Sequence, residues 1–328
     1  MSDSSILVTG GSGFTGGYLA RRLQADGYDV RLLIRSKEKA DGLRSLGFKV
    51  VEGDLANASA VDQAVAGVDT IYHVAALYRS DVASDKLFHE VNVEGTRTIL
   101  EAAKRHRVRR IVHTSTVGVH GNIKNPPADE TCDFAPRDAY QQSKVDGERL
   151  VETYRQKGMD IVIVRPVGIF GPGDTRFLKL FRAIAKKRFV MVGSGKSLYQ
   201  LTYIDDLVEG FRLCGEKPEA VCGTFIIGGP PAVRLNELVS QLARVLNVPE
   251  PRMRVPLWPF QLVAPACQAV CRAIGVEPPL YPRRLEFFSD DRSFSTAKAE
   301  RLLGYRPKVS LEEGLRRTAE WYRSQKWL

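Results

Sequence analysis

Short apolar runs alternate with amphipathic segments along the first half of the chain. Continuous apolar runs at residues 6–9, 30–34, 50–51, 70–74, 111–114 and 161–164 predict short β-strands. Between them apolar residues recur at helical spacing, most clearly in a long helix predicted from about Asp85 to His106. Short, continuously apolar strands separated by helices are typical of a parallel sheet covered on both faces. The pattern therefore predicts an α/β fold built on a doubly wound parallel sheet.

The second half of the chain has a different composition. After Pro166 prolines, aromatic residues and long irregular connections become more frequent. We therefore expect a sheet domain over residues 1–170 and a smaller, mainly C-terminal lobe over residues 171–328. A further apolar run predicts that one strand near 223–228 returns to the sheet, and Ser310-Leu311-Glu312-Glu313 predicts the capped start of a last amphipathic helix.

Glycines mark the junction between the first strand and the first helix. Gly10, Gly13 and Gly16 follow the apolar run at 6–9 directly, and Tyr18, Leu19 and Leu23 then recur at helical spacing. Glycine is needed here because a Cβ atom would block both a tight turn and the close approach of a phosphate to backbone N–H groups at a helix N-terminus. We interpret the loop as a pyrophosphate site for a dinucleotide. A plain turn is the alternative.

Two positions bear on which dinucleotide binds. A coenzyme with a free ribose 2′-hydroxyl is usually held by an acid near the end of the second strand, where this chain has Arg35. An arginine can pair with a 2′-phosphate instead, which favours NADP. Glu38, three residues on, leaves NAD open. Asp54, after the third strand, is placed to accept a hydrogen bond from an adenine amino group.

The most informative pair of side chains is Tyr140 and Lys144. Four residues apart on a predicted helix, they share one face. A neighbouring ammonium favours the phenolate and lowers the pKa of a tyrosine, which suits that tyrosine for proton transfer. The alternative is a solvated helix face, on which such a pair is common.

Charge and cysteine content narrow the partners. The chain of 328 residues has a formal net charge of +10, but its arginines and lysines are dispersed, so we expect no nucleic acid partner. An anionic ligand or an acidic membrane surface suits this charge. The apolar stretch from Pro256 to Gly275 is interrupted by prolines and Arg272, so no transmembrane segment is expected; a peripheral membrane contact stays open, although no clear stripe supports it.

Five dispersed cysteines indicate a reducing compartment, and the N-terminus lacks an export signal, so we expect a cytoplasmic protein. Cys267 and Cys271 have no histidine or carboxylate cluster beside them. We therefore expect no metal site.

Several motifs occur in one order along nearly the whole chain. They are the glycine loop, His73-Val74-Ala75-Ala76, the Val91–Thr96 segment around Asn92, Thr114-Ser115-Thr116, the Tyr140–Lys144 pair and Arg165-Pro166. Together they resemble the extended short-chain dehydrogenase/reductase family, of the NAD-dependent epimerase/dehydratase type. The segment from Arg165 to Asp174 is most similar to the 3β-hydroxysteroid and sterol-4-carboxylate dehydrogenase branch and to the dihydroflavonol reductase-like branch.

The resemblance implies a Rossmann-type fold and assigns roles to individual residues. Gly10, Gly13, Phe14 and Gly16 would hold the pyrophosphate, Asp54 and Leu55 the adenine, and Ala75, Ala76 and Pro166 would line the coenzyme. Lys144 would bind the nicotinamide ribose and tune Tyr140, the proton donor and acceptor. A third catalytic hydroxyl falls on Thr116, with Ser115 as the neighbouring choice. The family also implies a homodimer formed through the 85–106 helix and the Tyr140 helix.

These features predict an NAD(P)-dependent oxidoreductase that transfers a hydride to or from a hydroxy or keto carbon of a fairly apolar small molecule. A nucleotide-sugar 4-epimerase or dehydratase with retained NAD is the alternative, and a coenzyme-binding regulator without turnover is a third. We expect residues 255–263, with Leu280 and Tyr281, to form an aromatic-lined substrate pocket; the alternative is that they pack the core of the lobe.

Overall fold

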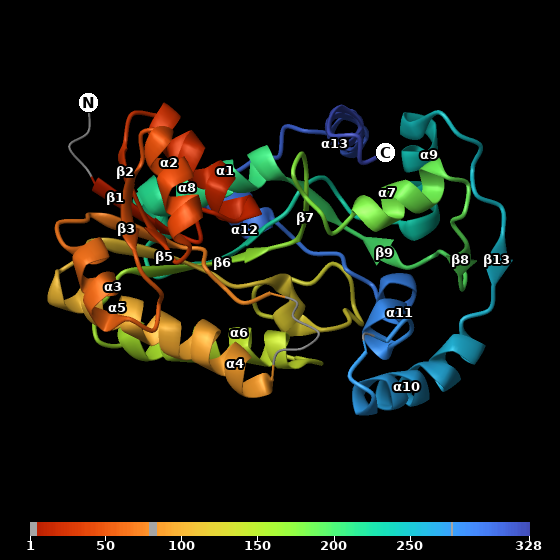
Figure 1. Ribbon diagram of the computed structural model, residues 1–328, viewed down its shortest axis with the longest axis horizontal. Helices are drawn as coiled ribbons and strands as arrows, with labels where there is room; N and C mark the ends of the chain where they lie inside the picture. Colours follow the sequence, from red (N-terminus) through yellow and green to blue (C-terminus); the bar gives the residue numbers. More distant parts are fainter. Residues whose placement is uncertain (1–4, 79–83, 277) are drawn as a thin grey trace.

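A parallel sheet forms the centre of the molecule (Figure 1). The computed structural model describes residues 5–78, 84–276 and 278–328. Every strand pair in the seven-stranded sheet is parallel, in the order β11-β6-β5-β4-β1-β2-β3. The strands are β1 (Ser5–Thr9), β2 (Asp29–Ile34), β3 (Lys49–Glu52), β4 (Thr70–His73), β5 (Arg110–Thr114), β6 (Ile161–Pro166) and β11 (Thr224–Ile227). The predicted doubly wound parallel sheet is confirmed.

Helices cover both faces of the sheet, and each layer has its own apolar core (Figure 1). One layer contains α1 (Phe14–Ala25), α8 (Ile204–Glu216) and α12 (Ala297–Leu303). The other contains α3 (Ala58–Val65), α5 (Gly95–Arg105) and α6 (Ala139–Arg155). A further helix, α2 (Lys37–Ser45), packs beside β3 and has only Ala40 buried, which explains why no apolar periodicity announces it.

The helix predicted from Asp85 to His106 is not one regular α-helix. It consists of α4 (Asp85–His89), a π-helix (Glu90–Glu94) and α5. The π-helix contains Asn92, whose buried amide is paired in both directions: its Oδ1 accepts from the Leu77 backbone N–H at 2.7 Å, and its Nδ2 donates to the Ser143 hydroxyl at 2.9 Å. Widened turns of this kind are frequent at functional sites. Apolar spacing alone does not reveal such a turn.

The smaller lobe lies beyond one end of the sheet (Figure 1). Its helices are α7 (Leu178–Ala185), α9 (Leu235–Leu246), α10 (Trp258–Ala273), α11 (Pro282–Ser289) and α13 (Leu311–Ser324). Its short strands are β7 (Gly168–Phe170), β8 (Met191–Val192), β9 (Leu198–Tyr199), β10 (Leu201–Tyr203), β12 (Val233–Arg234) and β13 (Arg254–Val255). Ser310 caps α13 as predicted, accepting from the Glu313 N–H at 3.2 Å.

The strand expected near 223–228 is β11, which pairs with β6 at the edge of the sheet. The chain thus leaves the sheet after β6, builds part of the lobe and returns. The division at residue 170 stays a prediction, since no observation tests it. Among the described residues, no helix has both the length and the apolar character needed to cross a membrane.

Candidate active site

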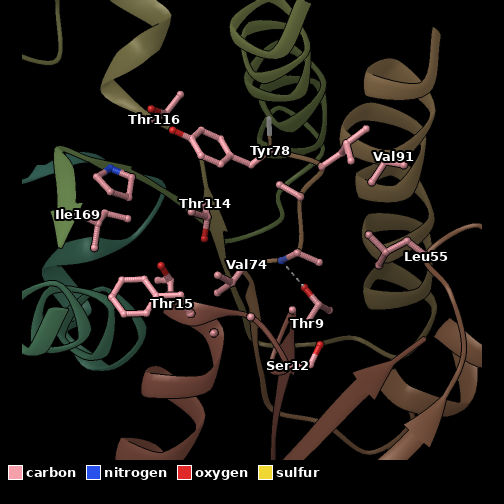
Figure 2. Close-up of a pocket in the computed structure, with 18 of the residues that line it drawn as sticks. Thr9, Ser12, Thr15, Leu55, Val74, Tyr78, Val91, Thr114, Thr116 and Ile169 are labelled. Atoms are coloured by element: carbon pink, nitrogen blue, oxygen red, sulfur yellow. Dashed lines mark hydrogen bonds between the residues drawn. The ribbon is translucent and has the colours of Figure 1, made fainter. Parts of the chain in front are cut away.

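A cavity of about 660 Å³ opens at the carboxyl ends of the parallel strands, where ligands of such sheets collect. Figure 2 shows Thr116 and Tyr78 towards one end of it, and Thr9 and Ser12 at the glycine-loop end. Every residue that the sequence predicts for catalysis or for coenzyme binding lines this one cavity: Gly10, Gly13, Phe14, Gly16, Arg35, Asp54, Leu55, Ala75, Ala76, Ser115, Thr116, Tyr140, Lys144 and Pro166. The structure therefore brings together side chains that the sequence spreads over more than 150 residues.

The glycine loop leaves no room for side chains at two positions. A Cβ atom on Gly16 would lie 2.3 Å from the Gly10 carbonyl oxygen, and one on Gly10 would lie 2.8 Å from the Ala75 nitrogen. Gly10 also has a φ of +74°, which disfavours other residues. The atoms that an added Cβ would meet belong to the backbone, which cannot move aside as a flexible side chain can. Both positions therefore require glycine.

A buried histidine fixes the loop that faces the glycines. His73 contacts the Thr9 hydroxyl through Nδ1 at 2.8 Å and the Thr96 hydroxyl through Nε2 at 3.0 Å. The Thr9 oxygen also accepts from the Ala75 N–H, the dashed bond in Figure 2. Burial lowers the pKa of His73 to about 3, so the ring stays neutral. The role of His73 is to hold Ala75 against the first strand.

Just after the ends of β2 and β3, Arg35 and Asp54 face each other at the cavity. The Arg35 Nη1 and the Asp54 Oδ2 are 3.5 Å apart, and the Arg35 side chain is 82% exposed. An exposed pair of this kind is weak, so the guanidinium can turn to another anion. Lys39 and Ser36 line the same end of the cavity, and sequence reasoning missed both. The spacing of four residues between Arg35 and Lys39 on a basic helix start was the available signal.

Tyr140 and Lys144 both lie inside the protein. The Asp138 carboxylate caps α6 by accepting from the Gln141 N–H at 2.8 Å, which places Tyr140 in the first turn. Tyr140 is 8% exposed and Lys144 3% exposed. The alternative interpretation of this pair, a solvated helix face, is therefore wrong.

The expected lowering of the tyrosine pKa is not what the structure shows. Burial, with Tyr78 stacked edge-on at 4.9 Å between ring centroids, raises the pKa of Tyr140 above its usual value; Arg283 and Arg176 only partly oppose this. The Lys144 Nζ donates to the Thr114 carbonyl at 2.6 Å. Tyr140 is held as the neutral phenol.

Burial also acts on Lys144 and lowers the pKa of its amine to about 8, against an opposing contribution from Glu148. Glu148 lies one helical turn further along α6, where both carboxylate oxygens accept from Arg165, at 3.0 and 2.6 Å. Arg165 in turn contacts the His120 Nε2 at 3.1 Å. The carboxylate of a buried ion pair thus lies one helical turn from Lys144 and partly opposes the lowering of its pKa.

The two candidate hydroxyls differ in their partners. The Thr116 Oγ1 accepts from the Gly118 N–H at 3.1 Å, which leaves its own hydrogen free to be donated elsewhere. The Ser115 Oγ is buried and, among the described residues, has no hydrogen-bonding partner. Both line the cavity, so geometry does not choose between them.

The other side of the cavity is lined by Arg176, which lies outside the residues predicted for catalysis and coenzyme binding and which the sequence suggests only as a charge for the phosphates of a nucleotide sugar. Arg176 donates from Nε to the Asp174 Oδ1 at 2.5 Å and from Nη2 to the Ile169 carbonyl at 2.9 Å. Its guanidinium lies over the Phe14 and Tyr78 rings, at 5.4 and 5.9 Å from their centroids. It therefore bridges the glycine loop and the surroundings of Tyr140.

The segment expected to supply an aromatic pocket does not do so. Residues 255–263, Leu280 and Tyr281 are absent from the described lining of this cavity. The alternative, burial in the lobe core, is also wrong for Trp258 and Leu262, which are 64% and 71% exposed. They lie on α10, at the outer side of the lobe, and α11 packs between α10 and the rest.

Sheet, glycine loop and buried tyrosine–lysine pair define a class of protein, the dinucleotide-binding α/β oxidoreductases. Comparison with known proteins agrees. The model of the NAD dependent epimerase/dehydratase family matches residues 6–228. The chain belongs to this family, the extended short-chain dehydrogenases/reductases, as the sequence motifs predicted.

Individual relatives show the range of the family. The chain is 34% identical to a 4-hydroxy-2-methyl-3-oxo-4-farnesyl-3,4-dihydroquinoline-1-oxide ketoreductase of Stigmatella aurantiaca, over 94% of each chain. It is 29% identical to the decarboxylating sterol-4-alpha-carboxylate 3-dehydrogenase of Mus musculus, over 95% of this chain and 89% of that one. The crystal structure of gox2253 has 28% identity and superposes over the whole of both chains with a TM-score of 0.83. The similarity to the sterol dehydrogenase branch is thus confirmed.

Proposed function

We propose that this chain is a reductase or dehydrogenase that moves a hydride between NADP and a hydroxy or keto carbon of an apolar small molecule. The observation that carries the proposal is the placement of Tyr140 and Lys144, both buried, at the wall of the cavity that also contains the glycine loop. A buried phenol and amine that face a cavity from one helix have no structural need that apolar residues would not meet better.

The residues have complementary tasks. The coenzyme supplies or takes the hydride. In the reducing direction Tyr140, held neutral by burial, gives its proton to the ketone oxygen, so that hydride and proton together make the alcohol. Thr116 donates a hydrogen bond to that oxygen, with Ser115 as the alternative donor. Lys144 binds the nicotinamide ribose and stabilises the phenolate that Tyr140 leaves behind.

The residues that line the cavity bear on which coenzyme and which kind of substrate bind. Arg35, with Lys39 beside it, supports NADP over NAD, although an NAD enzyme is the alternative. Tyr78, Val91 and Ile169 give the substrate side an apolar character. The names of the two relatives, a ketoreductase of a farnesylated quinoline and a dehydrogenase of a sterol carboxylate, agree with a bulky apolar substrate.

We also propose a cytoplasmic homodimer. In the described part of the chain the cysteines are unpaired, in agreement with a reducing compartment. The helices through which the dimer would form, α5 with the preceding π-helix and α6, carry charged side chains outward, among them the pairs Glu94–Arg97 and Asp146–Arg149. A dimer through this face would therefore have a polar interface.

The main test is Tyr140→Phe, which removes the acidic hydroxyl and little else. We expect turnover of a ketone that the wild type reduces to fall by at least about a thousandfold. The dissociation constant for NADPH should change by less than about threefold. Tyr18→Phe is the matched control: Tyr18 donates to the Pro172 carbonyl at 2.9 Å and does not line the described cavity, so turnover should persist. Surviving turnover in Tyr140→Phe would refute the mechanism.

A second measurement separates the reductase from the nucleotide-sugar epimerase or dehydratase. Denaturing the purified protein releases any bound dinucleotide, which chromatography then identifies. Stoichiometric NAD would favour the epimerase, which re-uses its coenzyme, whereas an empty site that binds NADPH reversibly favours the reductase. NADPH binding without turnover of any carbonyl compound would favour the regulator.

A further inference from the structure

The exposed apolar residues of this protein are concentrated in one segment. Of the twelve large apolar side chains that are exposed in the described structure, seven lie between Met253 and Val276. They are Met253, Trp258, Leu262, Val263, Val270, Ile274 and Val276. The other five are scattered over the rest of the chain, as is normal for a folded surface. The concentration therefore calls for an explanation.

Four of these side chains lie on the exposed side of α10: Trp258, Leu262, Val263 and Val270. Trp258, Leu262 and Val270, with the exposed Ala266, fall on a series at intervals of four and form a stripe that turns by about 40° around the helix at each step, and Ile274 follows directly after the helix. The stripe that sequence inspection did not resolve is thus present in three dimensions. The opposite face, towards α11, carries the buried Ala264. This helix is at least as apolar towards solvent as towards the protein.

The surroundings of the stripe are basic. No Asp or Glu occurs from residue 251 to residue 276. Arg252 and Arg254 are exposed at the strand that leads into α10, and β8, which pairs with this strand, follows the exposed Lys187 and Arg188. The acidic residues of the neighbouring α11, Glu286 and Asp290, are buried and face Arg137. The exposed Glu250, just before Arg252, is outnumbered by these cations. An apolar helix face bordered by a net positive charge matches an anionic amphiphilic surface.

We propose that the outer face of α10, with Arg252 and Arg254, docks this protein on the surface of a membrane that contains anionic lipids. The helix has 16 residues and contains Pro265, so it would lie in the interface rather than span the bilayer. Trp258 at its start suits the headgroup level, where tryptophan is enriched.

A second copy of the chain fits this face less well. In a two-fold dimer the same patch meets itself, so a patch in which Arg252 and Arg254 outnumber the exposed Glu250 would face an equal net positive charge. Phosphate-bearing headgroups carry the opposite charge. The membrane is therefore the occupant to which we commit.

The docking face is connected to the mouth of the active site. The helix α11, on which α10 packs, carries Arg283, and Arg283 forms an ion pair at 3.1 Å with Asp138, the cap of the Tyr140 helix. Transfer of an apolar substrate from the membrane rests on the proposed function, whereas the docking itself does not.

The test measures partition of the purified full-length chain onto vesicles by co-sedimentation. With vesicles that contain phosphatidylglycerol and phosphatidylcholine, we expect the wild type to bind and the double variant Trp258→Gln/Leu262→Gln to bind at least about tenfold more weakly, because two apolar anchors are lost. Leu46→Gln is the matched control: Leu46 is also an exposed apolar residue, but it lies at the end of α2. It should bind as the wild type does.

Two further measurements test the role of charge and the oligomeric state. Arg252→Gln/Arg254→Gln should weaken binding to the anionic vesicles, and vesicles of phosphatidylcholine alone should bind the wild type less than the anionic ones do. Absence of wild-type binding, or equal binding by the Trp258/Leu262 variant, would overturn the proposal. So would a wild-type dimer, seen by sedimentation velocity, that the same variant dissociates. Turnover of a water-soluble ketone should be unchanged in the variant, which keeps this result independent of the proposed function.

Discussion

The two sides of the cleft are built by different means. The side with the glycine loop, where we expect the coenzyme, is shaped mainly by the backbone. Gly10 and Gly16 allow backbone segments to approach closely, and Thr9 and His73 hold the Ala75 backbone against the first strand. On the substrate side, long side chains from different segments meet, with Arg176 lying across the Phe14 and Tyr78 rings. The coenzyme side is therefore rigid and sensitive to single atoms, whereas the substrate side can be altered by exchanging side chains.

The largest expected effect on coenzyme affinity belongs to the glycine loop. Gly16→Ala places a Cβ atom against the Gly10 carbonyl, and because backbone must move, the dissociation constant for NADPH should rise at least about a hundredfold in a fluorescence titration. Gly42→Ala is the matched control: a Cβ atom there meets nothing within 4 Å. In this helical position alanine should stabilise the fold by up to about 1 kcal/mol. Equal coenzyme affinity in both variants would contradict the rigid-loop description.

A pH titration tests the centre of the cleft. The pKa of Lys144 is lowered to about 8, so the charged amine is present below pH 8 and is lost above it. We expect the affinity for NADPH to fall by up to about tenfold between pH 7.5 and 9.5, and Lys144→Met to bind weakly with no such pH dependence. A pH-independent wild type would contradict the assignment of the ribose contact.

The same titration has a consequence for stability with a defined sign. In the unfolded chain the amine keeps its proton to about pH 10.5, so the unfolded state binds more protons between pH 8 and 10.5. The contribution of Lys144 to the free energy of unfolding therefore rises with pH in this window. Urea denaturation of the wild type and Lys144→Met at pH 7.5 and 9.5 should show this difference.

Coenzyme selectivity should show a smaller effect at the exposed end of the cleft. Arg35→Ala should weaken NADPH by about tenfold and NADH by less than about twofold, since only NADPH carries the 2′-phosphate. Loss of the weak Arg35–Asp54 pair should leave the melting temperature nearly unchanged. An equal loss for both coenzymes would show that Arg35 does not read the 2′ position.

The smallest effect is expected at the boundary between the two sides. Arg176→Gln keeps a donor but removes the charge beside Tyr140, and we expect the KM for a ketone substrate to rise by about fivefold. The dissociation constant for NADPH should stay within about twofold. A larger loss for NADPH than for the ketone would assign Arg176 to the coenzyme side instead.

The fold and the coenzyme side could largely be predicted from the sequence because their determinants are local. A glycine loop follows its strand directly, and Tyr140 and Lys144 share one helix, so short-range spacing carries the information. Spacing alone does not show whether the tyrosine–lysine pair faces solvent or the interior. In the structure both side chains are buried, and burial raises the pKa of Tyr140.

The substrate side was hidden because its members meet only through the fold. Tyr78 and Arg176 lie almost a hundred residues apart, and nothing in the local sequence around either one points to the other. For the residues of α10 the prediction was wrong. Their apolar, aromatic composition suggested a pocket, but composition does not specify whether a helix face is directed to the protein or to solvent. The π-helix around Asn92 could not be predicted either, because one widened turn barely changes the apolar spacing.

The position of β11 has a consequence for folding during synthesis on the ribosome. Strand β6 ends at Pro166, and its neighbour β11 begins only at Thr224. At synthesis rates of roughly 5–20 residues per second, the roughly sixty residues between them take ~3–12 s to appear. During this time β6 is an uncovered strand edge, open to pairing with other chains. Chaperone capture of nascent chains that stop between these two strands is therefore expected to exceed that of chains that extend past Ile227.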